Sequence, residues 1–84
     1  MRFRIEYKES LGQWHHASMS GDREPNTNGW VTILDDVSTK DAWLFESLVE
    51  FATGRIKGQW TTDELLEFAK RFPTFKAEKE RLSL

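Results

Sequence analysis

The segment Arg2-Phe3-Arg4-Ile5-Glu6-Tyr7-Lys8 alternates charged and bulky side chains without interruption. Because successive residues of a β-strand point to opposite faces, this pattern predicts a strand that is buried on one face only. Residues 9–12 contain a glycine and favour a turn, so residues 13–19 are predicted to return as the second strand of an antiparallel hairpin. A third strand is predicted over residues 30–34, where β-branched and aromatic side chains gather, ending at Asp35-Asp36.

The first predicted helix follows this third strand. Ser38 or Thr39 can cap its N-terminus, and Gly54 is suited to end it. Apolar side chains recur at helical spacing between these limits, which predicts one buried stripe along the helix. The expected members of that stripe are Leu44, Phe45, Leu48, Phe51 and Ala52.

The second predicted helix begins at Thr61. Thr61 and Glu64 have the spacing of a capping box, and the residues around them, Trp60 and Leu65, are placed to pack together as a hydrophobic staple. Pro73 lacks the N–H that a helix interior needs, so it is expected to stop or kink this helix. The expected buried stripe consists of Leu65, Phe68, Ala69 and Phe72.

Length and composition complete the prediction of the fold. A chain of 84 residues supports one core, so residues 1–84 are predicted to form a single domain. The elements predict an α+β fold in which a three-stranded antiparallel sheet is followed by two helices packed on one face. Residues 74–84 are predicted to form a short third helix or a flexible tail that a partner orders, because their apolar stripe is thin.

The composition also narrows the class of protein. Hydrophobic residues make up 38% and charged residues 31%, which is typical of a globular domain. No apolar run approaches the roughly 20 residues that cross a bilayer, and the first residues lack the apolar core of a signal peptide. The protein is therefore expected to be cytoplasmic, with no membrane partner. The absence of cysteine excludes disulfides, thiolate metal sites and a cysteine nucleophile.

Two residue pairs raise the question of metal binding or acid–base chemistry. His15 and His16 are neighbours on a predicted strand and point to opposite faces, so they cannot hold one ion together. Asp35 and Asp36 could hold Mg²⁺ at a strand end, but such a pair is more often a solubilising turn. Catalytic serine elbows and phosphate-binding glycine loops have no match in the sequence. The protein is therefore predicted to be non-catalytic and to use no cofactor or metal.

Trp43 is the strongest indication of function. At 100° per residue it lies about 140° from Leu48, the centre of the predicted stripe, and therefore on the polar side of the helix. Exposed tryptophan is enriched among residues that dominate protein interfaces. The alternative is that Trp43 packs under the tail or the long loop of residues 21–29. The predicted partner-binding residues are Trp43, Glu46, Glu50, Asp35, Asp36, Asp22, Arg23 and Glu24.

A second hypothesis rests on basic residues. The outward face of the first strand and the basic tail would together form a positive strip for RNA or single-stranded nucleic acid. The residues of that strip are Arg2, Arg4, Lys8, Lys70, Arg71, Lys76, Lys79 and Arg81. The net charge of −2 and the absence of a nucleic-acid-binding motif make this the less favoured interpretation.

The favoured prediction is a small non-catalytic protein-binding module or inhibitor. An acidic surface steers association toward a basic partner site, which the protein would occlude. Small acidic phage or plasmid proteins that block host machinery have this size and charge, so a similar origin is one interpretation. Both a monomer and a homodimer joined through an open sheet edge are compatible with the sequence.

Overall fold

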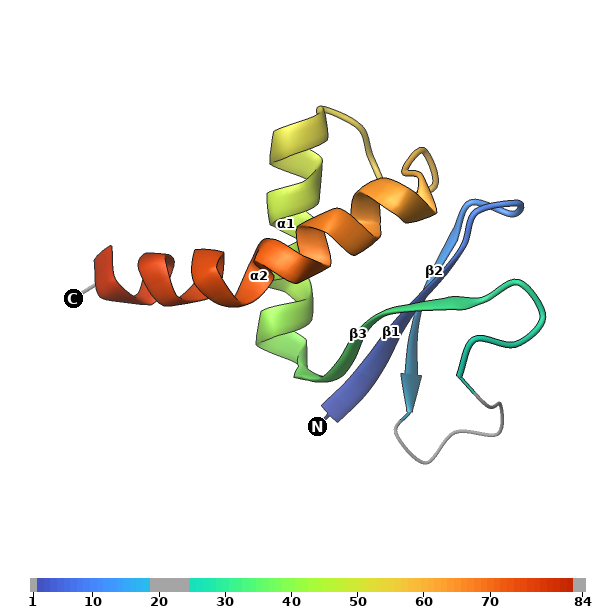
Figure 1. Cartoon of the computed structure of the whole chain (residues 1–84), viewed down its shortest axis with the longest axis horizontal. Helices are drawn as coiled ribbons and strands as arrows, with labels where there is room; N and C mark the ends of the chain where they lie inside the picture. Colours follow the sequence, from blue (N-terminus) through green and yellow to red (C-terminus); the bar gives the residue numbers. More distant parts are fainter. Residues whose placement is uncertain (1, 19–24, 83–84) are drawn as a thin grey trace.

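The computed structural model describes residues 2–18 and 25–82. Within these residues, three strands are followed by two helices, which confirms the predicted α+β fold (Figure 1). The strands are β1 (Arg2–Lys8), β2 (Gln13–Ser18) and β3 (Val31–Ser38). The helices are α1 (Thr39–Thr53) and α2 (Thr62–Leu82).

The strand β1 is the centre of the sheet, whose order is β2-β1-β3 with both pairings antiparallel. Its alternating residues Ile5 and Tyr7 are fully buried, as the pattern predicts. The prediction of one open charged face is wrong, because Arg4 and Glu6 are buried as well. The Arg4 Nε donates a hydrogen bond of 3.1 Å to Glu6 Oε2, so each charge has a partner within the same strand.

The strand β3 is longer than predicted, because it continues through Asp35 and Asp36 to its end at Ser38. Its register against β1 shifts twice, and each shift inserts an extra residue into β3. Asp36 has a φ of 53°, a left-handed conformation that aspartate tolerates better than most residues. Such bulges let a strand continue through residues that strands otherwise disfavour.

Both ends of α1 are capped as predicted. The hydroxyl of Ser38 accepts a hydrogen bond of 3.2 Å from the backbone N–H of Asp41. At the other end, Gly54 adopts a φ of 70° and its N–H donates to the carbonyl of Glu50 at 2.9 Å. These caps satisfy backbone groups that a helix leaves unpaired.

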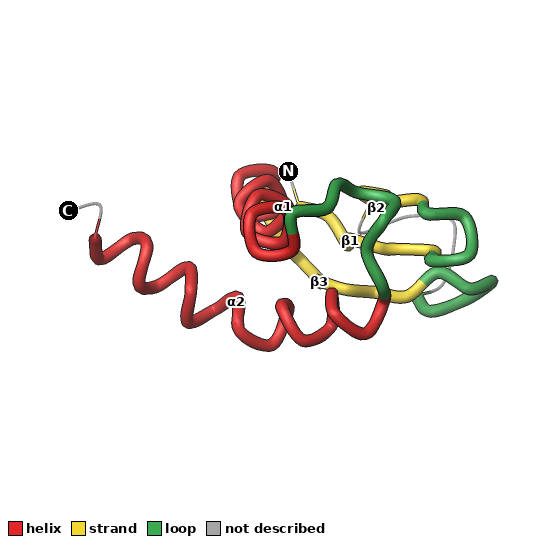
Figure 2. The backbone as a smooth tube through the Cα atoms, turned by 90° about the horizontal axis from the view of Figure 1, so that it is seen from above, coloured by secondary structure: helices red, strands yellow, loops and turns green. Residues whose placement is uncertain are grey.

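The helix α2 is one continuous element, so the prediction of a separate third helix is wrong. Pro73 lies inside it, and the helix changes direction near its middle (Figures 1 and 2), as an internal proline favours. The proximal half contributes Leu65 and Phe72 to the core. Residues 74–82, which we call the distal half of α2, run on past α1 and away from the sheet (Figure 2).

Aromatic side chains dominate the core between the sheet and the helices. The ring of Trp14 lies nearly parallel to Phe45 with centroids 6.1 Å apart, and it meets Trp60 edge-on at 5.4 Å. Phe45 in turn meets Phe72 of α2 edge-on at 5.4 Å. These are the favoured geometries of aromatic pairs, and they connect β2, both helices and the segment between the helices.

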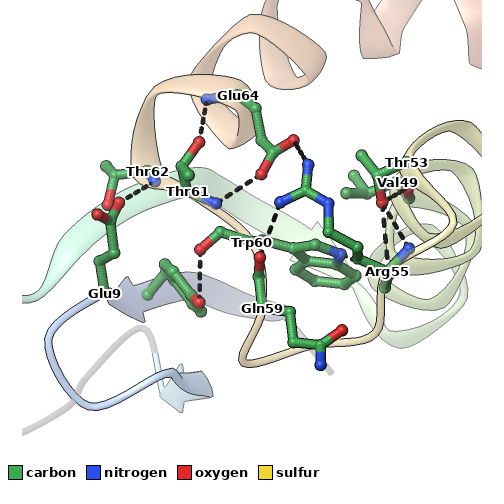
Figure 3. A network of polar contacts seen from close by, with 10 residues as sticks. Glu9, Val49, Thr53, Arg55, Gln59, Trp60, Thr61, Thr62 and Glu64 are labelled. Carbon is green, nitrogen blue, oxygen red and sulfur yellow. Dashed lines mark hydrogen bonds and ion pairs between the residues drawn. The ribbon is translucent and has the colours of Figure 1, made fainter.

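Trp60 fixes that connecting segment to the sheet (Figure 3). Its side chain is buried, and its indole N–H donates to the carbonyl of Arg55 at 2.7 Å. The carbonyl of Trp60 accepts a hydrogen bond of 2.8 Å from the hydroxyl of Tyr7 on β1. Burial raises the pKa of the Tyr7 hydroxyl above its ordinary value, so the hydroxyl remains a donor well into the alkaline range.

The predicted capping box at the start of α2 is present in the same network (Figure 3). The backbone N–H of Thr61 donates to Glu64 at 2.6 Å, and Glu64 N–H donates to the Thr61 hydroxyl at 3.2 Å. Burial alone would raise the pKa of the Glu64 carboxyl, but hydrogen bonds from Thr61 and the guanidinium of Arg55 outweigh it and lower that pKa. The orientation of α2 is thus set by polar contacts as well as packing.

The β1–β2 turn and the segment between the helices approach each other closely at Gly12 and Gly58. A Cβ atom on Gly12 would lie 2.8 Å from the Gly58 carbonyl oxygen, whereas a Cβ atom on Gly54 would meet nothing within 4 Å. Both Gly12 and Gly54 have φ values in the left-handed region, at 61° and 70°. The two glycines therefore differ mainly in the space around them.

We predict that Gly12→Ala destabilises the protein more than Gly54→Ala does. Both substitutions place alanine in a left-handed conformation, which costs about 1 kcal/mol, but only Gly12→Ala adds a clash with backbone. Urea unfolding of the two variants measures the difference in the free energy of unfolding. Equal losses would contradict the close contact between the turn and the inter-helix segment.

Candidate protein-interaction surface

One side of α1 carries several apolar side chains that the domain does not cover. Trp43 is 63% exposed, Phe51 is 91% exposed and Ile56, just after the helix, is 60% exposed. Polar residues on the same side separate them. We call this set the α1 outer surface, and it consists of Lys40, Trp43, Ser47, Glu50, Phe51 and Ile56.

The first of two hollows on this surface lies where the distal half of α2 passes α1. We call it the Trp43 hollow; it has a volume of about 560 Å³. Because α1 forms one wall and the distal half of α2 forms the other, the hollow depends on α2 continuing beyond Pro73. Its lining residues are Lys40, Asp41, Trp43, Leu44, Ser47, Lys79 and Glu80.

The second hollow lies at the other end of α1. We call it the Phe51 hollow; it has a volume of about 450 Å³ and is lined by Ser47, Glu50, Phe51, Gly54 and Ile56. Ser47 lines both hollows, so they adjoin at the middle of the helix. The α1 outer surface is therefore one continuous strip with a large apolar side chain beside each hollow.

The ion pair between Lys76 and Asp41 holds the distal half of α2 against the start of α1. Lys76 Nζ donates a hydrogen bond of 2.7 Å to Asp41 Oδ2. This hydrogen bond raises the pKa of the Lys76 ammonium above its ordinary value. Phe75, half-buried against the core, supports the same region.

The exposure of Trp43 confirms its predicted place on the outer side of the helix, but Glu46 was placed wrongly. Glu46 is only 8% exposed, and its carboxylate lies 3.1 Å from His16 Nε2 and 2.5 Å from Lys57 Nζ. A buried carboxylate with two partners inside the chain is unsuited to contact another protein. Glu46 therefore belongs to the structure of the domain.

Phe51 and Ala52 were also placed wrongly, because both are exposed. The side of α1 that is buried consists of Ala42, Phe45, Glu46 and Val49. At 100° per residue, the centre of that side is about 110° away from Leu48, the centre of the predicted stripe. The same rotation turns Phe51 toward solvent, and it therefore joins Trp43 on the outer side.

One signal of a second apolar side is visible in the sequence. Apolar residues occupy most of the circumference of α1, which is more than a single buried stripe requires. The predicted binding residues did not include Lys40, Ser47, Phe51 and Ile56, although Ser47 lies one helical turn from Trp43 in the sequence.

The remaining predicted acidic residues do not form one patch. Glu50 is exposed on the α1 outer surface. Asp35 and Asp36 are exposed on β3, where Asp36 Oδ1 accepts a hydrogen bond of 2.9 Å from Arg2 Nε. The other predicted partner-binding residues, Asp22, Arg23 and Glu24, lie outside the described residues.

The basic residues of the second hypothesis are divided between two regions. Arg2 and Arg4 are paired with carboxylates of the sheet, and the aliphatic stem of Lys8 lies near Gly29. Arg4 is buried, so the open basic face expected on β1 is wrong. In α2, Lys70 pairs with Glu67 and Lys76 with Asp41, and the exposed members are Lys70, Arg71, Lys79 and Arg81.

The two histidines contact different parts of the chain. The ring of His15 lies near Trp30, and its Nδ1 is 3.5 Å from Glu6, whereas His16 contacts Phe3 and Glu46. Across residues 2–18 and 25–82, no cluster of three or more histidine, aspartate or glutamate side chains is arranged to hold a metal ion. Neither described helix combines the length and apolarity of a membrane span.

Comparisons of this chain with protein-family models, with curated proteins and with solved structures find no match.

We predict that Lys76→Gln loosens the distal half of α2, while Lys70→Gln, which removes a second lysine pair of the same helix, does not. Amide hydrogen exchange of residues 74–82 at neutral pH measures the difference. Because the folded-state pKa of Lys76 is raised, its contribution is present below the ordinary value of 10.5 and is lost as the pH rises through the folded-state pKa. The helical circular dichroism of the wild type is therefore expected to fall above that pH, and to fall less in Lys76→Gln. Equal exchange in both variants would contradict the role of the ion pair.

Proposed function

We propose that this protein is a small non-catalytic protein-binding module that covers a surface of a partner protein with the α1 outer surface. The observation that carries the proposal is the alignment of Trp43, Phe51 and Ile56 beside two adjoining hollows. Single exposed apolar residues are common on monomers, but several large ones gathered on one side, with polar residues around them, are typical of an interaction site.

The rigidity of this surface supports binding over a purely structural role. Trp43 and Phe51 project from a helix that is capped at both ends and packed on the core through Phe45. The Trp43 hollow has a second wall that an ion pair holds in place. Rigid aromatic anchors beside a preformed hollow lose little conformational entropy on binding.

Charge would contribute less to this binding than the sequence predicts. Glu46, Asp41 and Asp36 are paired within the chain, and the exposed carboxylates that line the two hollows are Glu50 and Glu80. They support the proposal of a partner with a basic site, chiefly through the rate of association. The apolar anchors would supply most of the affinity.

Occlusion is the mechanism that this surface favours. The walled hollows and the anchors are suited to bury a patch of a partner, and no arrangement of the described residues suggests chemistry on that patch. A protein that buries such a patch blocks whatever else binds there. We therefore propose that the protein inhibits its partner by covering this patch, and that it does so in the cytoplasm. Its size and charge are similar to those of small acidic phage or plasmid proteins, so we propose a similar origin.

We predict that Trp43→Ala abolishes capture of the partner protein from a lysate of the source cells. The matched control is Leu11→Ala, which removes a side chain of similar exposure at the β1–β2 turn, away from α1. Nuclease treatment of the lysate and a salt titration distinguish a protein partner from nucleic acid, whose binding falls steeply with salt. Equal recovery with Trp43→Ala and Leu11→Ala would contradict the proposed function.

A further inference from the structure

We infer that a second copy of this chain occupies the α1 outer surface, in a twofold-symmetric dimer whose α1 helices pack antiparallel about Ser47. The inference rests on the proposed function, because it names an occupant of the same surface. It adds a regulatory consequence: a different partner protein must displace the second copy before it can bind.

The α1 outer surface is complementary to itself in this arrangement. Trp43 and Phe51 lie four residues on either side of Ser47. Antiparallel pairing centred on Ser47 therefore brings Phe51 of the second copy to the Trp43 hollow and Trp43 to the Phe51 hollow of the second copy. A twofold axis repeats every contact, so in both copies Trp43 and Phe51 are buried and both hollows are filled.

Ser47 has the size that the centre of such an interface requires. Packed helices lie about 8–10 Å apart, and their Cα atoms lie about 2.3 Å from each axis. Two Ser47 residues that face each other would then have Cα atoms about 5 Å apart at the wider spacing. A small exposed side chain at this position permits the approach.

The charges on the surface are also complementary. In the antiparallel arrangement, Lys40 lies about one helical turn from Glu50 of the second copy along the axis, within reach of two long side chains. Lys40 also lies level with Gly54 of the second copy, at the end of α1. The last turn of α1 contains no basic residue of its own, so a lysine from the second copy would complement the helix dipole there.

The exposed apolar area is of the size that a stable dimer needs. Trp43 and Phe51, at 63% and 91% exposure, together expose on the order of 300 Å². Ile56 and Leu82 add to this, and doubling by symmetry gives on the order of 1,000 Å² of apolar surface for burial. Stable interfaces bury about 1,200–2,000 Å² in total, of which about two thirds is apolar in homodimers.

The distal half of α2 would also contact the second copy in this dimer. It runs past α1 (Figures 1 and 2), and Lys79 and Glu80 form one wall of the Trp43 hollow. A second α1 laid beside the first would lie against this projecting half. Leu82, at the end of this projecting half, is 80% exposed in the single chain.

Charge reversal with rescue tests the inference. We expect the wild type to form dimers in sedimentation equilibrium, and Lys40→Glu or Glu50→Lys alone to weaken dimerisation roughly tenfold, because each reversal creates a repulsion at two symmetric positions. The double variant should bind more tightly than either single variant, because it restores opposite charges at both symmetric positions. An acid in the first turn and a base in the last turn both suit the helix dipole, so misfolding would not explain a loss.

A cross-link tests the position of the axis. The chain has no cysteine, so Ser47→Cys introduces a single thiol, and a Cα separation of about 5 Å is suited to a disulfide. Oxidation is expected to link two copies of Ser47→Cys. Glu67→Cys, at an exposed position on α2 outside the proposed interface, is the control: it should dimerise as the wild type does but form no covalent link under the same conditions.

The inference is overturned if the wild type remains monomeric up to about 100 μM, well above the dissociation constant of a standard interface. It is also overturned if dimers resist both single charge reversals. A monomer that still loses its captured protein on Trp43→Ala would leave the proposed function standing alone. If the protein forms this dimer but still captures a partner protein after Trp43→Ala, the dimer stands and the proposed function is contradicted.

Discussion

The position of α2 depends on the burial of Trp60. Its indole fills the space between the sheet and the helices, edge-on to Trp14, while its backbone carbonyl accepts the hydroxyl of Tyr7. Because this residue immediately precedes the capping box, the point where α2 begins and the direction in which it leaves are fixed together. A buried ring whose polar atoms all have partners is costly to move.

The shape of the interaction surface follows from that constraint. Once α2 is anchored at its start, its distal half must pass α1, and the ion pair of Lys76 with Asp41 keeps it there. The rotation of α1 is set separately by Glu46, which is buried and pairs with His16 and Lys57. Together these contacts turn Trp43 and Phe51 outward beside two hollows. The α1 outer surface is therefore shaped by contacts within the domain that are not themselves part of that surface.

Features set by residues close together in the sequence could be predicted, whereas features set by residues far apart could not. The caps at Ser38 and Gly54 and the capping box at Thr61 depend on neighbours within four residues, and all were predicted. The burial of Glu46 depends on His16, which is 30 residues away, so no local pattern could reveal that α1 is rotated. Trp43 lies away from the buried side of α1 in both the predicted and the observed orientation of the helix, so its exposure could be predicted. Phe51 lies on the buried side in the predicted orientation and on the exposed side in the observed one, so its exposure could not. Beyond Pro73, α2 is held to α1 by the contact of Lys76 with Asp41, two residues that are 35 positions apart in sequence.

The orientation of α1 is the central claim, and hydroxyl-radical footprinting of the chain at a dilution where it is monomeric tests it most directly. Mass spectrometry of the oxidised peptides reports which side chains water reaches. The account predicts rapid modification of Trp43 and Phe51, with Trp60 and Phe45 protected until the protein unfolds. Protection of Phe51 to the same degree as Phe45, or of Trp43 to the same degree as Trp60, would contradict it.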